Sequence, residues 1–143
     1  MNICVFKGLK LIEDAYKVRT LVFIKEQKVS KEIEMDGLDK DSYHVIIYEN
    51  NLPIATGRLL KKDNIYSIGR VAVIKEYRHK NYGKIVMDEL IKKAKDLGVK
   101  EVFIHSQLHA KKFYEKLGFM PFGKVFKEAN IKHISMKKRL NSY

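Results

Sequence analysis

The sequence predicts an α/β fold whose central sheet is mixed: mostly antiparallel, with one parallel strand pair and flanking helices. Three strand patterns follow one another within residues 43–74. The turns between them are Asn50-Asn51 and Asp63-Asn64, which are typical of tight hairpins. A strand–helix–strand unit then occupies residues 65–106, and such a unit adds a parallel strand through a right-handed crossover. Hairpins and one crossover in the same chain therefore predict a mixed sheet.

The first half of the chain is expected to begin with a strand at residues 2–7 and an amphipathic helix at residues 10–25. Apolar side chains recur in that helix at helical spacing, at Leu11, Ala15, Val18 and Val22. Residues 26–42 are charged and irregular, with a turn at Asp36-Gly37. The three hairpin strands are expected at residues 43–49, 53–61 and 65–74.

The second half contains the clearest helix, at residues 82–98. Its apolar face is formed by Val86, Leu90, Ala94 and Leu97, and Gly98 ends it. The remaining elements are expected to be a strand at 101–106, a helix at 108–117 that ends before Gly118, and strands at 119–126 and 131–138. The order is therefore β, α, β, β, β, α, β, α, β, β.

Length and composition favour one domain over residues 1–143, which is enough chain for a single core. No apolar run reaches the roughly 18 residues that a membrane helix needs, so no membrane association is expected. The single cysteine, Cys4, cannot form an internal disulfide, which fits a reducing cytoplasm. No group of Cys and His has the spacing of metal ligands, so no metal is expected.

The net charge of +12 is unevenly distributed along the chain. Residues 1–60 contain nine Lys or Arg and nine Asp or Glu, whereas residues 61–143 contain 20 and eight. The whole excess therefore lies in the second part. A polyanionic ligand is favoured there electrostatically, although most single lysines are expected to be ordinary solvated surface residues.

A basic turn precedes the long helix, with the sequence Arg78-His79-Lys80-Asn81-Tyr82-Gly83-Lys84. A helix N-terminus offers unpaired N–H groups and a partial positive charge, which suit a pyrophosphate. Gly83 has no side chain to block close approach. Arg78, Lys80 and Lys84 add formal charge. Basic loops before helices are also common, so by itself the turn is equally compatible with a plain helix start.

A second segment, Gln107 to Phe119, reads as a short helix with two adjacent aromatic residues, Phe113 and Tyr114. Ala110 and Tyr114 are four residues apart, so they are expected to share one helix face. Phe113 and Tyr114 would otherwise be read as core aromatics at the end of a helix.

Together these two segments resemble the signature motifs of the GNAT superfamily of acyl-CoA-dependent N-acetyltransferases. The first motif, Arg/Gln-x-x-Gly-x-Gly/Ala, is matched by Arg78 and Gly83, with Asn81 in place of the middle glycine. Asn is enriched in left-handed backbone geometry, so the departure is tolerable. The second motif, Asn-x-x-Ala-x-x-Phe-Tyr-x-x-x-Gly-Phe, is matched at five positions, with Gln107 where Asn is usual. The matched positions are Ala110, Phe113, Tyr114, Gly118 and Phe119.

The resemblance extends over almost the whole chain, to a subgroup of small bacterial GNAT proteins. It implies a single N-acetyltransferase domain at 1–143 that uses acetyl-CoA (coenzyme A as the carrier). The backbone of Val71, Ala72 and Val73 would pair with the pantetheine amides. The other cofactor-binding residues that it implies are Arg78, His79, Lys80, Asn81, Tyr82, Gly83, Lys84, Gln107 and Phe113.

The implied reaction is direct transfer of an acetyl group to a primary amine within a ternary complex. Tyr114 is expected to be the general acid, because a phenol can protonate the departing thiolate. Arg70 stands where several members of the superfamily carry a basic carboxylate, and an arginine cannot act as the base. His109 is the first choice for that role because it lies beside the tyrosine helix. The alternatives are Glu34, Asp36, His105, Glu128 and His133, or no dedicated base at all if the amine arrives partly neutral.

Other functions remain to be weighed against this one. The departures at Asn81 and Gln107 could indicate an acyl-CoA-binding sensor with little transferase activity. A nucleic-acid binder is disfavoured, since interleaved exposed aromatics and a recognition-helix motif are absent. The acceptor, a small-molecule or protein amine, is left open, and so is the oligomeric state, although family members often form homodimers.

Overall fold

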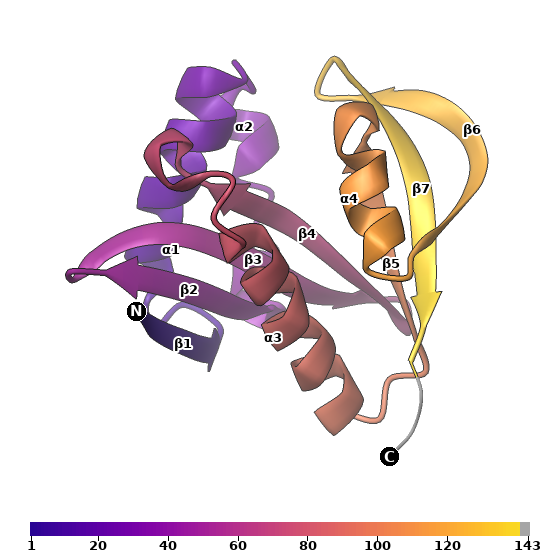
Figure 1. Cartoon of the computed structure of the whole chain (residues 1–143), viewed down its shortest axis with the longest axis horizontal. Helices are drawn as coiled ribbons and strands as arrows, with labels where there is room; N and C mark the ends of the chain where they lie inside the picture. The colour runs from indigo at the N-terminus through magenta and orange to yellow at the C-terminus, as the bar shows by residue number, and fades with distance from the viewer. Residues whose placement is uncertain (141–143) are drawn as a thin grey trace.

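The computed structural model describes residues 1–140, and its centre is a seven-stranded sheet in the order β1-β2-β3-β4-β5-β7-β6 (Figure 1). The strands are β1 (Asn2–Lys7), β2 (Tyr43–Glu49), β3 (Leu52–Lys62), β4 (Ile65–Val73), β5 (Glu101–Gln107), β6 (Met120–Glu128) and β7 (Ile131–Arg139).

The sheet has the predicted mixed character. Strands β4 and β5 are parallel, and every other neighbouring pair is antiparallel. Asn50, Asn51, Asp63 and Asn64 all have positive φ, between 51° and 65°. This is the left-handed geometry that a two-residue hairpin loop requires. The predicted hairpins and the single parallel pair are thus confirmed.

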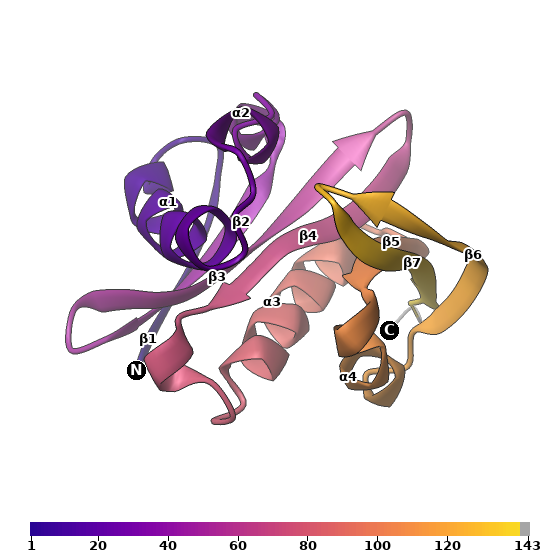
Figure 2. The same ribbon diagram turned by 90° about the horizontal axis from the view of Figure 1, so that it is seen from above.

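Helices cover both faces of the sheet (Figure 2). Helices α1 (Ile12–Arg19) and α2 (Lys31–Glu34) lie on one face, and α3 (Tyr82–Asp96) and α4 (Lys111–Lys116) lie on the other. Within residues 1–140 no helix is long and apolar enough to cross a bilayer.

The segment expected to form one helix at residues 10–25 consists of a shorter α-helix followed by a π-helical turn. The α-helix starts at Ile12, and after Arg19 it widens into the π-helical turn, η1 (Thr20–Glu26). The segment expected to be irregular contains α2 and a 3-10 turn, η2 (Asp39–Asp41). Helix α2 is too short for a periodic pattern, and it begins where the Ser30 hydroxyl accepts a hydrogen bond from the Ile33 N–H at 3.3 Å.

Helix α3 packs closely on β3 because Gly57 lacks a side chain. A Cβ at this position would lie 2.5 Å from Val86 Cγ1 and 2.9 Å from Leu90 Cδ1. Val86 and Leu90 are fully buried. The close contact fixes the height of α3 above the sheet, and therefore the position of the turn at its N-terminus.

The helix expected at residues 108–117 is divided in two. Residues Leu108–Ala110 form a 3-10 turn, η4, and α4 starts only at Lys111. Ala110 is therefore the N-cap of the helix that carries Tyr114 rather than a residue within it. The turn is closed by a hydrogen bond from the Lys111 N–H to the Leu108 carbonyl, which is one residue tighter than an α-turn.

Candidate active site

The parallel strands β4 and β5 separate part-way along their length. Their pairing runs only from Tyr66 and Val102 to Ile68 and Ile104. Strand β4 nevertheless continues to Val73, and β5 continues to Gln107. The C-terminal parts of the two strands thus leave an opening in the sheet (Figure 1). Ligands of α/β sheets commonly bind at such carboxyl ends of strands.

The backbone of β4 directs groups of Val71 and Val73 toward this opening, where the Val73 carbonyl accepts a hydrogen bond from Arg78 Nε at 2.9 Å. Ala72 pairs with Thr56 of β3, and in the same register the Ile74 N–H donates to the Ile54 carbonyl at 3.0 Å. Antiparallel strands alternate in direction, so Ala72 directs its backbone groups toward β3, whereas Val71 and Val73 direct theirs toward the opening. An amide chain placed there could pair with Val71 and Val73 as a strand would, while Ala72 contributes a small side chain.

The basic turn lies at the start of α3, beside this opening. Asn81 precedes the helix with φ 68°, and it makes no side-chain capping bond. The first N–H groups of α3 therefore lack an intrahelical partner. A Cβ at Gly83 would lie 3.4 Å from Phe113 Cζ and 4.0 Å from Val73 Cγ2. Gly83 of α3 therefore lies against both β4 and α4. Any other residue at this position would place a Cβ in the space between them.

Several side chains of the turn hold it in place rather than point freely outward. Arg78 donates to both carboxylate oxygens of Glu26 and to the Val73 carbonyl. The Tyr82 hydroxyl donates to Glu49. Lys84 pairs with Asp88 at 2.8 Å. Besides Asn81 and Lys84, the exposed residues of the turn are His79, with φ 63°, and Lys80, whose ammonium lies 5.6 Å from the Tyr77 ring centroid.

Tyr114 is held by aromatic neighbours on α4 and just beyond it. Its ring packs edge-on against Phe113 and Phe119, with centroid distances of 5.0 Å and 6.0 Å. Burial raises the pKa of Tyr114 to about 12, because a phenolate would be poorly solvated there. Among residues 1–140 nothing is hydrogen-bonded to its hydroxyl. Tyr114 is therefore a neutral phenol with an uncommitted proton.

His109 belongs to a chain of hydrogen bonds across the opening. Its Nε2 lies 2.8 Å from Gln107 Oε1, and Gln107 Nε2 donates to Gln27 Oε1 at 2.8 Å. Since an amide oxygen only accepts, His109 Nε2 carries the hydrogen. The neutral His109 ring then has its lone pair on Nδ1. Gln107, expected to contact the cofactor, also links β5 to the end of η1 through Gln27, the residue that directly follows η1.

The acidic loop forms a buried network of charges that the sequence did not predict. Glu34 and Asp39 are 3% exposed. Each carboxylate is paired with arginine, and the members of this network are Arg19, Glu34, Asp36, Asp39, Arg58 and Arg70. Burial acts to raise the pKa of Asp36, but hydrogen bonds from Arg58 and from the Leu38 N–H outweigh it and lower that pKa to about 2.

This network removes two of the alternative bases, because Glu34 and Asp36 are neutralised by arginines. Their role is to fasten the η1–α2 segment to β3 and β4. A signal was present in the sequence: Arg19 directly follows Val18 on the apolar side of the first helix, so a buried arginine required buried carboxylates.

The remaining alternatives, His105, Glu128 and His133, lie together at the far side of the opening. His105 Nδ1 is 3.1 Å from Glu128 Oε1, and His133 Nε2 is 3.7 Å from Glu128 Oε2. Phe126 packs against both imidazoles, at centroid distances of 5.1 Å and 5.8 Å. The cluster is an ordered arrangement of titratable groups rather than three separate surface residues.

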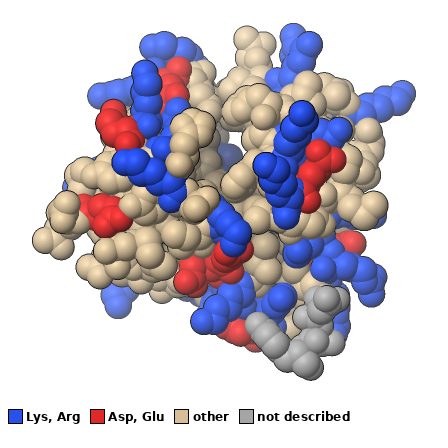
Figure 3. Space-filling model, viewed as in Figure 1, with Lys and Arg blue, Asp and Glu red and all other residues tan. Residues whose placement is uncertain are grey.

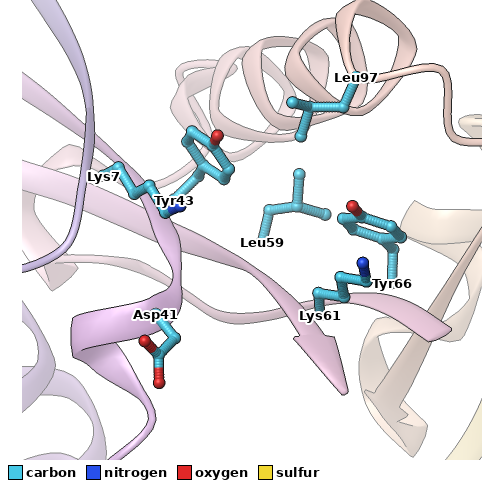
Figure 4. Close-up of a pocket in the computed structure, with 7 residues that line it drawn as sticks. All are labelled: Lys7, Asp41, Tyr43, Leu59, Lys61, Tyr66 and Leu97. Atoms are coloured by element: carbon cyan, nitrogen blue, oxygen red, sulfur yellow. The ribbon is translucent and has the colours of Figure 1, made fainter. Parts of the chain in front are cut away.

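A surface pocket at the other end of α3 contains none of these residues. It is lined by Lys7, Asp41, Tyr43, Leu59, Lys61, Tyr66 and Leu97 (Figure 4). The ammonium groups of Lys93 and Lys7 lie 4.7 Å and 5.6 Å from the Tyr43 ring centroid. Leu97 directly follows α3, whereas the basic turn precedes it, so this pocket is separate from the candidate site.

Comparison with known proteins agrees with this geometry. The model of the acetyltransferase (GNAT) domain family matches residues 12–140. The uncharacterised N-acetyltransferase YjcF of Bacillus subtilis (strain 168) is 35% identical over 139 residues, which cover 96% of this chain and 99% of YjcF.

Two crystal structures have a closely similar fold. An acyl-CoA N-acyltransferase from Pseudomonas aeruginosa is 27% identical with a TM-score of 0.88, and Escherichia coli ElaA is 27% identical with a TM-score of 0.89. Each match covers 96% of this chain and 99% of the solved one. The family match and these relatives show that the chain is an acetyltransferase of the GNAT family, whose fold binds acyl-CoA.

Proposed function

We propose that this protein transfers an acetyl group from acetyl-CoA to a primary amine by direct transfer within a ternary complex. The observation that carries the proposal is the opening between β4 and β5, with the backbone of Val71 and Val73 on one side, together with the Tyr114 hydroxyl, which has no partner among residues 1–140. Phe113 links the two, since it approaches Gly83 and Val73 and packs on Tyr114. The family match supports the proposal, which treats residues 1–143 as one cytoplasmic N-acetyltransferase domain.

The residues present suit coenzyme A in shape and charge. Val71 and Val73 offer backbone groups to a pantetheine arm with Ala72 between them, and Phe113 forms a wall beside them. The N–H groups of Tyr82, Gly83 and Lys84 face a pyrophosphate, and His79 and Lys80 add exposed basic groups. Arg78 and Asn81 set the conformation of the turn. Gln107 acts by orienting His109.

Acetyl-CoA, when bound, supplies an activated thioester. The Tyr114 hydroxyl donates its proton to the departing sulfur, whose thiol form has an ordinary pKa of about 8.5. Its raised pKa keeps Tyr114 protonated at rest but also makes it a weaker acid, so it gives up the proton only as negative charge develops on sulfur and regains one from solvent afterwards. His109 Nδ1 takes a proton from the attacking amine, because its Nε2–H is already donated to Gln107.

The first test is thermal unfolding with and without acetyl-CoA, for the natural protein and for Tyr114→Phe. Ligand in hundredfold excess over its dissociation constant adds about 2.7 kcal/mol of stability. We expect an upward shift in both proteins, because Tyr114 acts on the reaction rather than on cofactor binding.

The second test is release of free thiol from acetyl-CoA in the presence of a panel of amines. We expect Tyr114→Phe to lose about a hundredfold or more in turnover, which is the low end of what general acids contribute. A protein that binds acetyl-CoA but acetylates no amine would support the alternative, an acyl-CoA sensor. The absence of any thermal shift with acetyl-CoA would contradict both functions.

A further inference from the structure

The strands beyond the opening bring polar side chains to one face of the sheet. Gln107 of β5 lies directly opposite His133 of β7, and His105 lies opposite Ser135. Opposed residues, and residues two apart on one strand, point to the same face. That face is the one toward Gln27 at the end of η1, with which Gln107 is bonded. Figure 3 shows the surface hollowed between the part of the molecule that carries α2 and the part that carries β6 and β7.

Of the two carboxylate oxygens of Glu128, one accepts a hydrogen bond from a neighbour among residues 1–140. Its Oε1 accepts a hydrogen bond from His105 Nδ1 at 3.1 Å. That bond raises the pKa of His105 and lowers the pKa of Glu128, so the latter is a carboxylate. The other oxygen, Oε2, has no hydrogen-bond donor among residues 1–140.

His133 faces this free oxygen with its Nε2, because the hydrogen on its Nδ1 is committed elsewhere. His133 Nδ1 lies 2.7 Å from the Ile131 carbonyl, which can only accept, so Nδ1 carries the hydrogen. In the neutral ring Nε2 then holds a lone pair, and it lies 3.7 Å from Glu128 Oε2. Two acceptors thus face each other, too far apart to be hydrogen-bonded.

A donor with several hydrogens and a positive charge would satisfy both atoms. An alkylammonium group has three N–H donors and can donate to a carboxylate and an imidazole together. Phe126 holds both imidazoles in place. The Glu128 side chain is 48% exposed, so the position is reachable from solvent. Its charge is also influenced by Arg70 of β4, whose own partners are Glu34 and Asp36.

We propose that Glu128 Oε2 and His133 Nε2 form the docking site at which the acceptor arrives as an ammonium group; before it attacks, this group must lose one proton, which the proposed function assigns to His109. The proposal rests on the proposed function and specifies its substrate class: alkylamines that are protonated at neutral pH, in preference to arylamines, which are not. His105 is a positioning residue, because it orients the Glu128 carboxylate.

The test is NMR of the full chain with 15N-labelled histidine, titrated with n-propylamine in the presence of coenzyme A. At about pH 8 the 15N signals report directly whether His133 Nε2 carries a hydrogen, and the docking site requires that it carries none without the amine. Propylammonium should then shift the His133 and His105 signals saturably. Tetramethylammonium has the same charge but no N–H donor, and should bind about tenfold more weakly because a charged hydrogen bond is lost. His105→Gln and His133→Gln assign the signals.

Two matched variants test the carboxylate. Glu128→Gln should weaken propylammonium binding at least tenfold. Asp63→Asn in the β3–β4 turn removes the same charge elsewhere and should bind propylammonium as the natural protein does. Equal responses to the two cations, an Nε2-protonated His133 in the amine-free protein, or an unchanged Glu128→Gln would overturn the docking site. Acetyl-CoA binding in the same samples separates the two proposals. Binding without an amine response removes the docking site alone, whereas an amine response without acetyl-CoA binding removes the proposed reaction.

Discussion

Arg78 and Glu26 join the basic turn to the helical layer on the opposite face of the sheet. Arg78 Nη1 lies 2.6 Å from Glu26 Oε2, and Nη2 lies 2.5 Å from Oε1. Arg78 Nε also donates to the Val73 carbonyl at 2.9 Å. The guanidinium therefore fastens the turn to both β4 and η1. An arginine that the sequence suggests as a phosphate ligand acts in the structure as a brace of the turn.

Replacing Glu26 with Gln tests this brace. The change removes a negative charge near the turn and releases Arg78, so we expect coenzyme A to bind a few-fold more tightly at low salt. The gain should shrink at high salt, because exposed charges are screened. Calorimetric titration with coenzyme A measures it. Stability should change by less than about 1 kcal/mol, as for other exposed ion pairs.

Asp63→Asn is the control for the loss of one negative charge, and its affinity for coenzyme A should be closer to that of the natural protein. Weaker binding in Glu26→Gln would mean that the fixed position of Arg78 matters more to the ligand than the charge that holds it.

Gly57→Ala tests how closely α3 must approach β3. The added Cβ would lie 2.5 Å from Val86 Cγ1, so the helix or its side chains must shift. Overpacking of this kind costs about 1–3 kcal/mol, and we expect that loss in chemical denaturation. Gly69→Ala is the matched control, because nothing lies within 4 Å of a Cβ at that position. Equal stability of the two variants would show that α3 adapts without strain.

Much of this architecture follows from local patterns. The hairpins could be predicted because Asn and Asp at the turns tolerate positive φ, and α3 because its apolar face and Gly98 define its length. Tyr114 could be found because its motif is contiguous. The ion pair between Arg78 and Glu26 could not be predicted from the sequence, since it joins residues 52 positions apart. The same holds for Gln27 with Gln107 and for the buried arginine network, because long-range pairing of polar groups leaves no periodic signal.

The buried network predicts how stability depends on pH. The folded-state pKa of Asp36 is about 2, against an ordinary value of 3.8. A lowered pKa means that Asp36 contributes stability above the ordinary value and loses it as the pH falls toward 2. The difference corresponds to about 2 kcal/mol. We therefore expect the free energy of unfolding to fall between about pH 4 and pH 2, and Asp36→Asn to remove Asp36's share of that fall.

The measurement is chemical denaturation of both proteins across this pH range. Asp63→Asn is the control for the loss of a carboxylate outside the network, and its pH dependence should match that of the natural protein. If Asp36→Asn showed the same acid dependence as the natural protein, the ion pairs with Arg58 and Arg70 would not contribute to folding.

Gln27 is expected to be a positioning residue for His109. Gln27 Oε1 accepts from Gln107 Nε2, which directs Gln107 Oε1 toward His109 Nε2 and leaves Nδ1 as the basic nitrogen. Gln27→Met keeps the size of the side chain but cannot accept this bond well. We expect it to lower kcat about tenfold and to leave acetyl-CoA binding unchanged. Gln27→Glu still offers an acceptor oxygen to Gln107, so it should retain most of the activity.

The pH profile of kcat separates positioning from simple packing. If His109 is released from Gln107, the pH at which kcat falls should shift, whereas a packing defect alone should leave it in place. A Gln27→Met enzyme with the natural kcat and pH profile would show that the chain of amides does not act on His109.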